Sequence, residues 1–123
     1  MEIRFENKVA FITGAAGGIG YAAARMFAEA GASVVMADLD SRVTDRAKEL
    51  EAEGHNAIGI RCDVSDEVQV KAAVEKAVAV FGKLDIAYNN VGIHAAVRED
   101  LTETEGWDFD RVISVNLRGV WNC

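Results

Sequence analysis

Short apolar runs alternate along the chain with longer segments in which apolar residues recur every three or four positions. The short runs have the length of strands buried on both faces, and they cover residues 9–12, 33–38, 57–62 and 84–89. The longer segments predict amphipathic helices over residues 21–30, from 40 or 41 to about 53, from 65 to 81, and from about 107 onward. Strand and helix therefore alternate four times.

Most of the predicted helices have a defined start and end. A glycine follows each of the first three helices as a C-terminal stop, at Gly31, Gly54 and Gly82. Asp40 or Ser41 is suited to cap the second helix and Ser65 to cap the third. The apolar stripes consist of Ile19, Ala23, Met26, Phe27 and Ala30 in the first helix, Val43, Ala47 and Leu50 in the second, Val70, Val74, Ala77, Val78 and Phe81 in the third, and Val112, Ile113, Leu117 and Val120 in the last.

The alternation of strands and helices predicts the class of fold. Strands joined through helices run parallel, and their crossovers are right-handed. We therefore predict an α/β fold with a doubly wound parallel sheet in the order 3-2-1-4. All 123 residues fit one domain, in which residues 93–106 form a polar, acidic loop.

The charge balance and the cysteines exclude several classes of function. The chain has 13 basic and 20 acidic residues and a net charge of −7, which argues against nucleic-acid binding through a basic surface. No apolar run is long enough to span a bilayer, and the first residues lack the layout of a signal peptide, so we expect a cytoplasmic protein with no membrane partner. The pattern of Cys62 and Cys123 predicts free thiols and no metal site.

Glycines cluster where the first predicted strand meets the first predicted helix. Gly14, Gly17, Gly18 and Gly20 lie within this junction. Glycine lets the backbone approach an anion closely, and the free N–H groups of a helix N-terminus point at it. We interpret the junction as a phosphate-binding loop, and the alternative is a tight turn without a ligand. The pattern does not match the Gly-x-x-x-x-Gly-Lys-Ser/Thr of nucleoside-triphosphate loops.

An acid at the end of the second predicted strand indicates the kind of phosphate ligand. Asp38 follows Gly20 by 18 residues, and a dinucleotide fold has an acid about 20 residues beyond its glycines, where it holds the adenosine ribose. A surface acid near a turn is the alternative. A carboxylate repels a 2′-phosphate, and Gly17 and Leu39 offer no positive charge to hold one. We therefore predict NAD rather than NADP.

Four motifs together resemble the short-chain dehydrogenase/reductase family. Residues 13–20 match its Thr-Gly-x-x-x-Gly-x-Gly, and residues 63–64 follow the third strand as its adenine-contacting pair does. Residues 89–92 are similar to its Asn-Asn-Ala-Gly signature, with Val91 in place of the alanine. Asn116 lies where the family has the asparagine of its catalytic helix.

The resemblance implies a Rossmann-type fold and a role for each matching residue. The implied cofactor-binding residues are Gly14, Gly18, Ile19, Gly20, Asp38, Leu39, Asp63, Val64, Asn90 and Gly92. Among them, Asp38 would hold the adenosine ribose, Asp63 would meet the adenine amino group, and Asn90 would pass close to the nicotinamide-side ribose. Asn116, the implied catalytic residue, would hold a water in a proton relay. Without the family, Asn116 is interpreted as satisfying helix backbone, and residues 89–90 as turn residues.

The resemblance covers only the first half of such an enzyme. The family's Ser and Tyr-x-x-x-Lys groups lie beyond the asparagine helix, and this chain has no Tyr-x-x-x-Lys: Tyr21 precedes Arg25, and Tyr88 precedes Gly92, at that spacing. We interpret both tyrosines as packing residues. We expect residues 1–123 to be the N-terminal, cofactor-binding part of a longer oxidoreductase, truncated after its last helix begins.

The leading functional hypothesis is an NAD-dependent oxidoreductase that transfers hydride between a secondary alcohol and a carbonyl of a small molecule. The 123 residues alone should show little or no turnover. Two alternatives stay open, a non-catalytic NAD-binding fragment and a structural or interaction module with an empty glycine turn. The fourth strand would be an unprotected edge and the last helix would lack part of its cover, so we expect a homo-oligomer.

Overall fold

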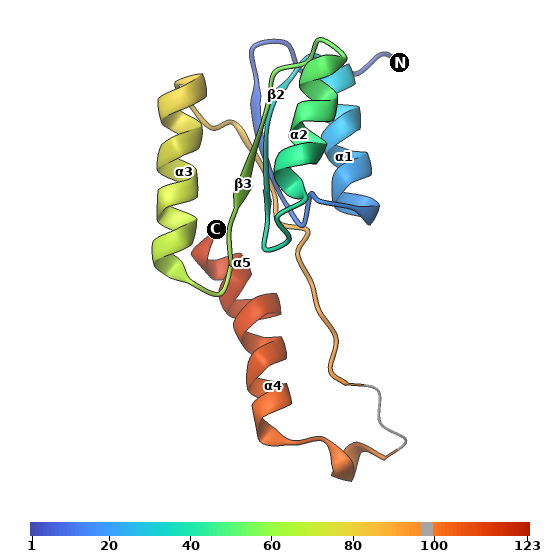
Figure 1. Ribbon diagram of the computed structural model, residues 1–123, viewed down its shortest axis with the longest axis vertical. Coiled ribbons are helices and arrows are strands. Elements are labelled where there is room, and N and C mark those ends of the chain that lie inside the picture. The colour runs from blue at the N-terminus through green and yellow to red at the C-terminus, as the bar shows by residue number, and fades with distance from the viewer. Residues whose placement is uncertain (97–99) are drawn as a thin grey trace.

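The computed structural model describes residues 1–96 and 100–123, and it contains a four-stranded sheet with helices on both faces (Figure 1). The strands are β1 (Val9–Thr13), β2 (Ser33–Asp38), β3 (Ala57–Arg61) and β4 (Ile86–Tyr88). They are all parallel and lie in the order β3-β2-β1-β4, which confirms the predicted fold class and strand order. The predicted loop over residues 93–106 includes 97–99, which lie outside the described residues.

Three helices cover the sheet and a further helical segment follows β4. The covering helices are α1 (Gly18–Glu29), α2 (Val43–Ala52) and α3 (Glu67–Phe81). The later segment consists of the short 3₁₀ helix η1 (Leu101–Glu103), α4 (Gly106–Ile113), the π-helical turn η2 (Ser114–Arg118) and α5 (Gly119–Asn122). Figure 1 shows α1 and α2 together on one face of the sheet and α3 on the other, while α4 extends away from the sheet.

Alternate residues of the two central strands fill two apolar layers. Ile12 and Met36 belong to the layer packed with α1 and α2, and Phe11 and Val35 belong to the layer packed with α3. All four side chains are buried. Because successive side chains of a strand point to opposite faces, burial of both faces explains why the strands read as unbroken apolar runs.

The buried face of α1 differs from the predicted stripe. The buried residues are Gly20, Ala24 and Ala28, whereas Ile19 and Met26, which were expected to face the sheet, are 73% and 69% exposed. Small side chains bring a helix axis closer to a sheet than large ones do, so the face without bulky residues becomes the contact face. The predicted stripe was therefore wrong for Ile19 and Met26, whereas Phe27 packs against the core.

The predicted cap of the third helix is wrong by one residue. Asp66, not Ser65, is the N-cap of α3, and its Oδ1 accepts hydrogen bonds from the backbone N–H groups of Val68 (3.0 Å) and Gln69 (3.4 Å). Ser65 instead donates its hydroxyl to Asp63. The helix also exposes Val78, which was expected to be buried, and buries Ala73 in its place.

The predicted cap of the second helix is wrong as well. The N-cap of α2 is Arg42, whose side chain makes no capping hydrogen bond. Asp40 instead binds the backbone of the N-cap residue, because its Oδ1 accepts a hydrogen bond from the Arg42 N–H at 2.9 Å. The apolar stripe of Val43, Ala47 and Leu50 is buried as predicted.

β4 is the edge strand and is shorter than the predicted run of residues 84–89. Just before it, Asp85 Oδ2 accepts a hydrogen bond from the Val9 N–H at 2.8 Å, and the same carboxylate forms ion pairs with Lys83 (3.1 Å) and Lys8 (3.9 Å). The Val9 N–H, more than the lysines, lowers the pKa of Asp85. The Asp85 N–H also donates to the Val9 carbonyl at 3.0 Å, so a side chain and the backbone of one residue together join the start of β4 to β1.

The segment from α4 to α5 exposes an apolar surface. Its exposed large side chains are Trp107, Phe109, Ile113, Leu117, Val120 and Trp121. The expectation that the last helix lacks part of its cover is confirmed. Contiguous apolar surface of this kind marks a contact site for another surface.

Candidate functional site

A cleft of about 620 Å³ lies at the carboxyl ends of the four strands. Its lining includes seven of the residues predicted to bind a cofactor, namely Gly14, Asp38, Leu39, Asp63, Val64, Asn90 and Gly92. Gly18, Ile19 and Gly20 lie at the start of α1, and Asn116 lies in η2, so these four do not line the cleft. Ligands of open parallel sheets bind at this edge, which supports a binding site.

The loop between β1 and α1 requires glycine at three positions. Gly14 and Gly18 have φ angles of +68° and +55°, the left-handed region that other residues rarely adopt. A Cβ on Gly20 would lie 2.0 Å from the carbonyl oxygen of Gly14, so the helix begins in direct contact with the loop. The N-cap, Gly17, offers no side chain to the N–H groups of the first turn, which leaves them available to an anion.

Asp38 holds two backbone segments as well as lining the cleft. Its Oδ2 accepts a hydrogen bond from the Ala16 N–H at 3.0 Å, and its Oδ1 accepts one from the Asp40 N–H at 2.9 Å. Each carboxylate oxygen has a second lone pair, so the half-buried carboxylate can still accept ligand hydroxyls. The spacing between Asp38 and the glycines did not predict that its carboxylate also holds the loop.

Arg46 of α2 is a residue near the glycine loop that sequence reasoning missed. Its Nε donates to the carbonyl oxygen of Ala16 at 3.3 Å. Arg46 lies at a different position from Gly17 and Leu39, the two at which the sequence showed no positive charge. No local pattern marks Arg46, because the contact joins residues that are 30 positions apart in the sequence.

Asp63 presents one carboxylate oxygen to the cleft. Its Oδ1 accepts hydrogen bonds from the Ser65 N–H at 2.9 Å and the Ser65 hydroxyl at 2.6 Å. Across residues 1–96 and 100–123, no hydrogen-bond partner is found for Oδ2. A fixed carboxylate with one open oxygen is suited to accept a hydrogen bond from a ligand amino group.

Val64 links the cleft to the end of the helical segment. Its carbonyl oxygen accepts a hydrogen bond from Asn122 Nδ2 at 2.8 Å. A Cβ on Gly119 would lie 2.7 Å from Val64 Cγ2, so the helix backbone packs directly on this side chain. The neighbouring Cys62 is buried, and burial raises the pKa of its thiol to about 11. Cys62 and Cys123 are both free, as predicted.

Asn90 fastens the end of β4 to the end of β1. Its backbone N–H donates to Thr13 Oγ1 at 2.9 Å and its side-chain Nδ2 donates to the Thr13 carbonyl at 3.1 Å. Val91 N–H also donates to Thr13 Oγ1, at 3.2 Å. A Cβ on Gly14 would lie 2.9 Å from Asn90 Nδ2, so the amide packs directly on the glycine loop. Asn90 therefore has a structural role, as expected of a turn residue, but the residue it binds, Thr13, is at the end of a different strand.

Asn116 holds the loop that follows β4. Its Oδ1 accepts a hydrogen bond from the Ile93 N–H at 2.8 Å, and its Nδ2 donates to the Ile93 carbonyl at 2.7 Å. Both ends of the amide thus pair with one distant residue, instead of with the backbone of its own helix. Because Gly92 and Ile93 line the cleft, Asn116 sets the position of that wall from outside it.

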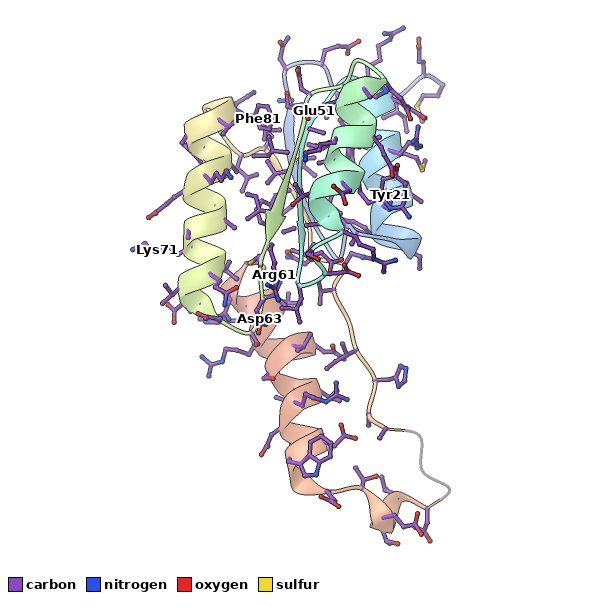
Figure 2. The ribbon with its side chains drawn as sticks, viewed as in Figure 1. Tyr21, Glu51, Arg61, Asp63, Lys71 and Phe81 are labelled. Carbon is purple, nitrogen blue, oxygen red and sulfur yellow. The ribbon has the colours of Figure 1, made fainter. Side chains whose placement is uncertain are left out.

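The two tyrosines lie apart from this arrangement. Tyr21 packs half-buried between α1 and α2, where its hydroxyl donates to Glu49 at 2.8 Å and accepts from Arg25 at 3.1 Å. Figure 2 shows Tyr21 beside α1 and α2, whereas Asp63 lies at the lower end of the sheet near α5. Tyr88 is on the edge strand, with no lysine among its hydrogen-bond partners in the described chain. Neither tyrosine has the environment of a tyrosine acid.

Two further features can be stated for the described ranges. Residues 1–96 and 100–123 contain no helix that is long and apolar enough to cross a membrane. In the same ranges, no three or more His, Cys, Asp or Glu side chains are grouped in a way that could hold a metal ion.

Comparison with known proteins gives consistent relatives. A model for "short chain dehydrogenase" matches residues 8–123. The mitochondrial borneol dehydrogenase of Lavandula x intermedia is 46% identical over 119 residues, which are 96% of this chain and 44% of that protein. Secoisolariciresinol dehydrogenase of Forsythia intermedia is 44% identical over 121 residues, covering 98% of this chain and 43% of that protein.

Solved structures agree in fold. A short-chain dehydrogenase/reductase of Burkholderia phymatum in complex with NAD has a TM-score of 0.91 and 38% identity, over 98% of this chain and 42% of that one. A 3-ketoacyl-(acyl-carrier-protein) reductase of Brucella melitensis complexed with NADH has a TM-score of 0.84 and 42% identity, over 95% and 47%. The chain thus spans less than half the length of these relatives.

Proposed function

The chain belongs to the short-chain dehydrogenase family, and on that premise we propose that residues 1–123 form the NAD-binding part of an oxidoreductase domain. The observation that carries the proposal is the cleft at the carboxyl ends of the strands, bordered by the glycine loop and by Asp38 and Asp63. Bound NAD supplies the hydride acceptor, and the parent enzyme would act on a secondary alcohol or carbonyl of a small molecule.

The residues present fit a dinucleotide. The N–H groups of Gly18, Ile19 and Gly20 would hold the pyrophosphate, since the first turn of α1 has no side-chain cap. The remaining lone pairs of Asp38 would accept the adenosine ribose hydroxyls, and the open Oδ2 of Asp63 would accept the adenine amino group.

The walls of the cleft would orient the rest of the cofactor. Leu39 and Val64 are apolar lining residues on the adenosine side. Asn90 and Gly92 would run beside the nicotinamide-side ribose. In this arrangement the apolar residues would exclude water from the apolar parts of the ligand, and the polar groups of the ligand would face polar atoms of the protein.

Asn116 is proposed to support proton transfer from a fixed position. Its two hydrogen bonds to Ile93 leave one N–H of Nδ2 and one lone pair of Oδ1 for a water. The 123 residues contain no Tyr-x-x-x-Lys, so the proton donor would come from elsewhere in the parent enzyme. The chain alone should not oxidise NADH with a carbonyl substrate.

Calorimetric titration with NAD and NADP tests the binding proposal. We expect saturable NAD binding and a dissociation constant for NADP about tenfold or more higher, because Asp38 repels the 2′-phosphate. Tighter binding of NADP would contradict the choice of cofactor. Absence of saturable binding for both would leave the alternative of a structural module with an empty glycine turn.

Binding without turnover would support the second candidate, a non-catalytic NAD-binding fragment, and the missing Tyr-x-x-x-Lys favours that outcome for this chain.

We also propose a homo-oligomer. The exposed apolar surface from α4 to α5 and the open edge of β4 support it.

A further inference from the structure

Three backbone polar groups of the glycine loop are held by β2 and α2. The Ala15 N–H donates to the Ala37 carbonyl at 3.2 Å, and the Ala16 N–H donates to Asp38 Oδ2 at 3.0 Å. The Ala16 carbonyl accepts from Arg46 Nε at 3.3 Å. Both polar atoms of Ala16 are therefore bonded to side chains, and the residue itself is buried.

Ala16 is the last residue before two consecutive glycines of the loop. Gly17 and Gly18 follow it, with Gly18 in the left-handed region, and α1 begins there. Glycines lose more conformational freedom on ordering than other residues do, so an untethered loop would have to be ordered by its ligand. A fixed Ala16 limits the conformations open to the two glycines before any ligand arrives.

Arg46 is itself held in place by two residues. Its guanidinium lies 4.9 Å from the centre of the Tyr21 ring, and its Nη1 is 3.1 and 3.2 Å from the two carboxylate oxygens of Glu49. Tyr21 donates its hydroxyl to the same carboxylate at 2.8 Å. Because the guanidinium is planar, stacking and two directed hydrogen bonds fix its orientation toward Ala16.

We propose that Arg46 is a positioning residue for the phosphate-binding loop. It holds the Ala16 carbonyl so that the first-turn N–H groups of α1 face the cleft in the absence of ligand. The inference rests on the proposed NAD binding and adds to it a residue of α2 that does not line the cleft. Its contribution is pre-organisation of the loop and not charge on the phosphate.

The test compares Arg46→Met with Arg25→Met. Arg25 joins the same two helices, because it binds both carboxylate oxygens of Glu53 and the Tyr21 hydroxyl, but it contacts no atom of the glycine loop. Both variants lose an inter-helix arginine, so a general loss of stability would appear in both. Only Arg46→Met removes the bond to the loop.

Two probes separate the loop from the rest of the cleft. ADP carries a pyrophosphate, and adenosine does not. For Arg46→Met we expect the ADP dissociation constant to rise roughly tenfold while that of adenosine stays within about twofold, since only the phosphate subsite is disturbed. Arg25→Met should bind both probes as the unaltered chain does. Equal weakening of both probes, or no change, would overturn the proposal.

Salt distinguishes positioning from charge. If Arg46 acted by attracting the phosphates, the effect of Arg46→Met would fade as ionic strength shortens the screening length from about 10 Å at 0.1 M to about 3 Å at 1 M. Pre-organisation predicts the same ratio of ADP dissociation constants at both salt concentrations. A ratio that falls to unity at high salt would refute the positioning role.

A measurement without ligand keeps the two proposals distinguishable. Amide hydrogen exchange of Ala16 and the residues beside it should be faster in Arg46→Met and unchanged in Arg25→Met. Failure of the unaltered chain to bind ADP would refute the proposed function, whatever the exchange shows. Normal ADP binding in both variants, with unchanged exchange, would refute only the role of Arg46.

Discussion

The polar residues in and beside the cleft bind backbone more than they bind each other. Asp38 holds Ala16, Asn90 holds Thr13, and Asn116 holds Ile93 by two bonds. Each of these contacts fixes a segment of main chain that borders the cleft. The same residue types that can contact a cofactor therefore also determine the shape of its site.

The contact between Gly20 and Gly14 gives a direct prediction. In Gly20→Ala the new Cβ would meet the Gly14 carbonyl at 2.0 Å, so the loop or the start of α1 must move. We expect a loss of about 2 kcal/mol in the free energy of unfolding, measured with urea, together with weaker NAD binding. Gly17→Ala is the control, since a Cβ there meets no atom within 4 Å and its φ is −172°. Equal losses in the two variants would disprove the steric argument.

Seven of the residues predicted from the sequence line one cleft, but their hydrogen-bond partners were not predicted. Asp38 and the glycines were recognisable because spacing along the chain reflects the strand–turn–helix geometry. Arg46 was not, because its contact with Ala16 depends on how α2 rotates over the sheet edge. Hydrogen bonds between elements distant in sequence leave no local pattern.

At the scale of elements, strand positions were predictable and helix faces were only partly so. Strands buried on both faces appear as unbroken apolar runs, so order and number were correct. The stripe of α1 was only partly correct: its buried residues, Gly20, Ala24 and Ala28, are small, whereas Ile19 and Met26 are exposed. Phe27 packs against the core as predicted. α2 was correct because its buried stripe is also its only apolar stripe.

The cap of α3 provides a test at this scale. Asp66→Ala should lower the melting temperature by roughly 4 °C at pH 7, since two backbone N–H groups lose their acceptor. Ser65→Ala should have a smaller effect, because Ser65 is not the N-cap. A larger fall in melting temperature for Ser65→Ala than for Asp66→Ala would contradict the role of Asp66 as the N-cap.

The same cap predicts a pH dependence. Hydrogen bonding by Gln69 lowers the pKa of Asp66 below its ordinary value of 3.8 in the folded chain. The folded state therefore favours the carboxylate, and the stabilisation is present above the unfolded pKa and is lost as pH falls through the folded one. The difference in melting temperature between the unaltered chain and Asp66→Ala should be constant from pH 5 to 7 and shrink below about pH 4.

At the scale of the whole molecule, the sheet core and the helical segment from α4 to α5 differ in how well they are covered. The layers over β1 and β2 are buried on both faces of the sheet, whereas α4 extends away from it and the segment from α4 to α5 has exposed apolar residues (Figure 1). The site depends on this segment, because Asn116 and Asn122 both bind backbone at the cleft edge.

This exposure predicts self-association. Leu117, in the proposed contact surface, is 65% exposed, and Met26, on α1, is 69% exposed. A charged residue at either position should therefore change the stability of the monomer little. We expect the chain to form dimers or larger species by analytical ultracentrifugation, and Leu117→Glu to shift it toward monomer. Met26→Glu should associate as the unaltered chain does. A monomeric unaltered chain at high concentration would contradict the proposal.

The pairing of β1 with β4 also has a consequence for the order of assembly. β2 pairs with β1 soon after it along the chain, and β3 pairs with β2 in the same way, whereas β4 returns to β1 after both have been completed. Contacts between distant parts of a chain carry the larger entropic barrier and form later. Asn90, Gly92 and the contact made by Asn116 all follow β4 along the chain. We therefore expect the wall of the cleft at the ends of β2 and β3 to form before the wall that follows β4.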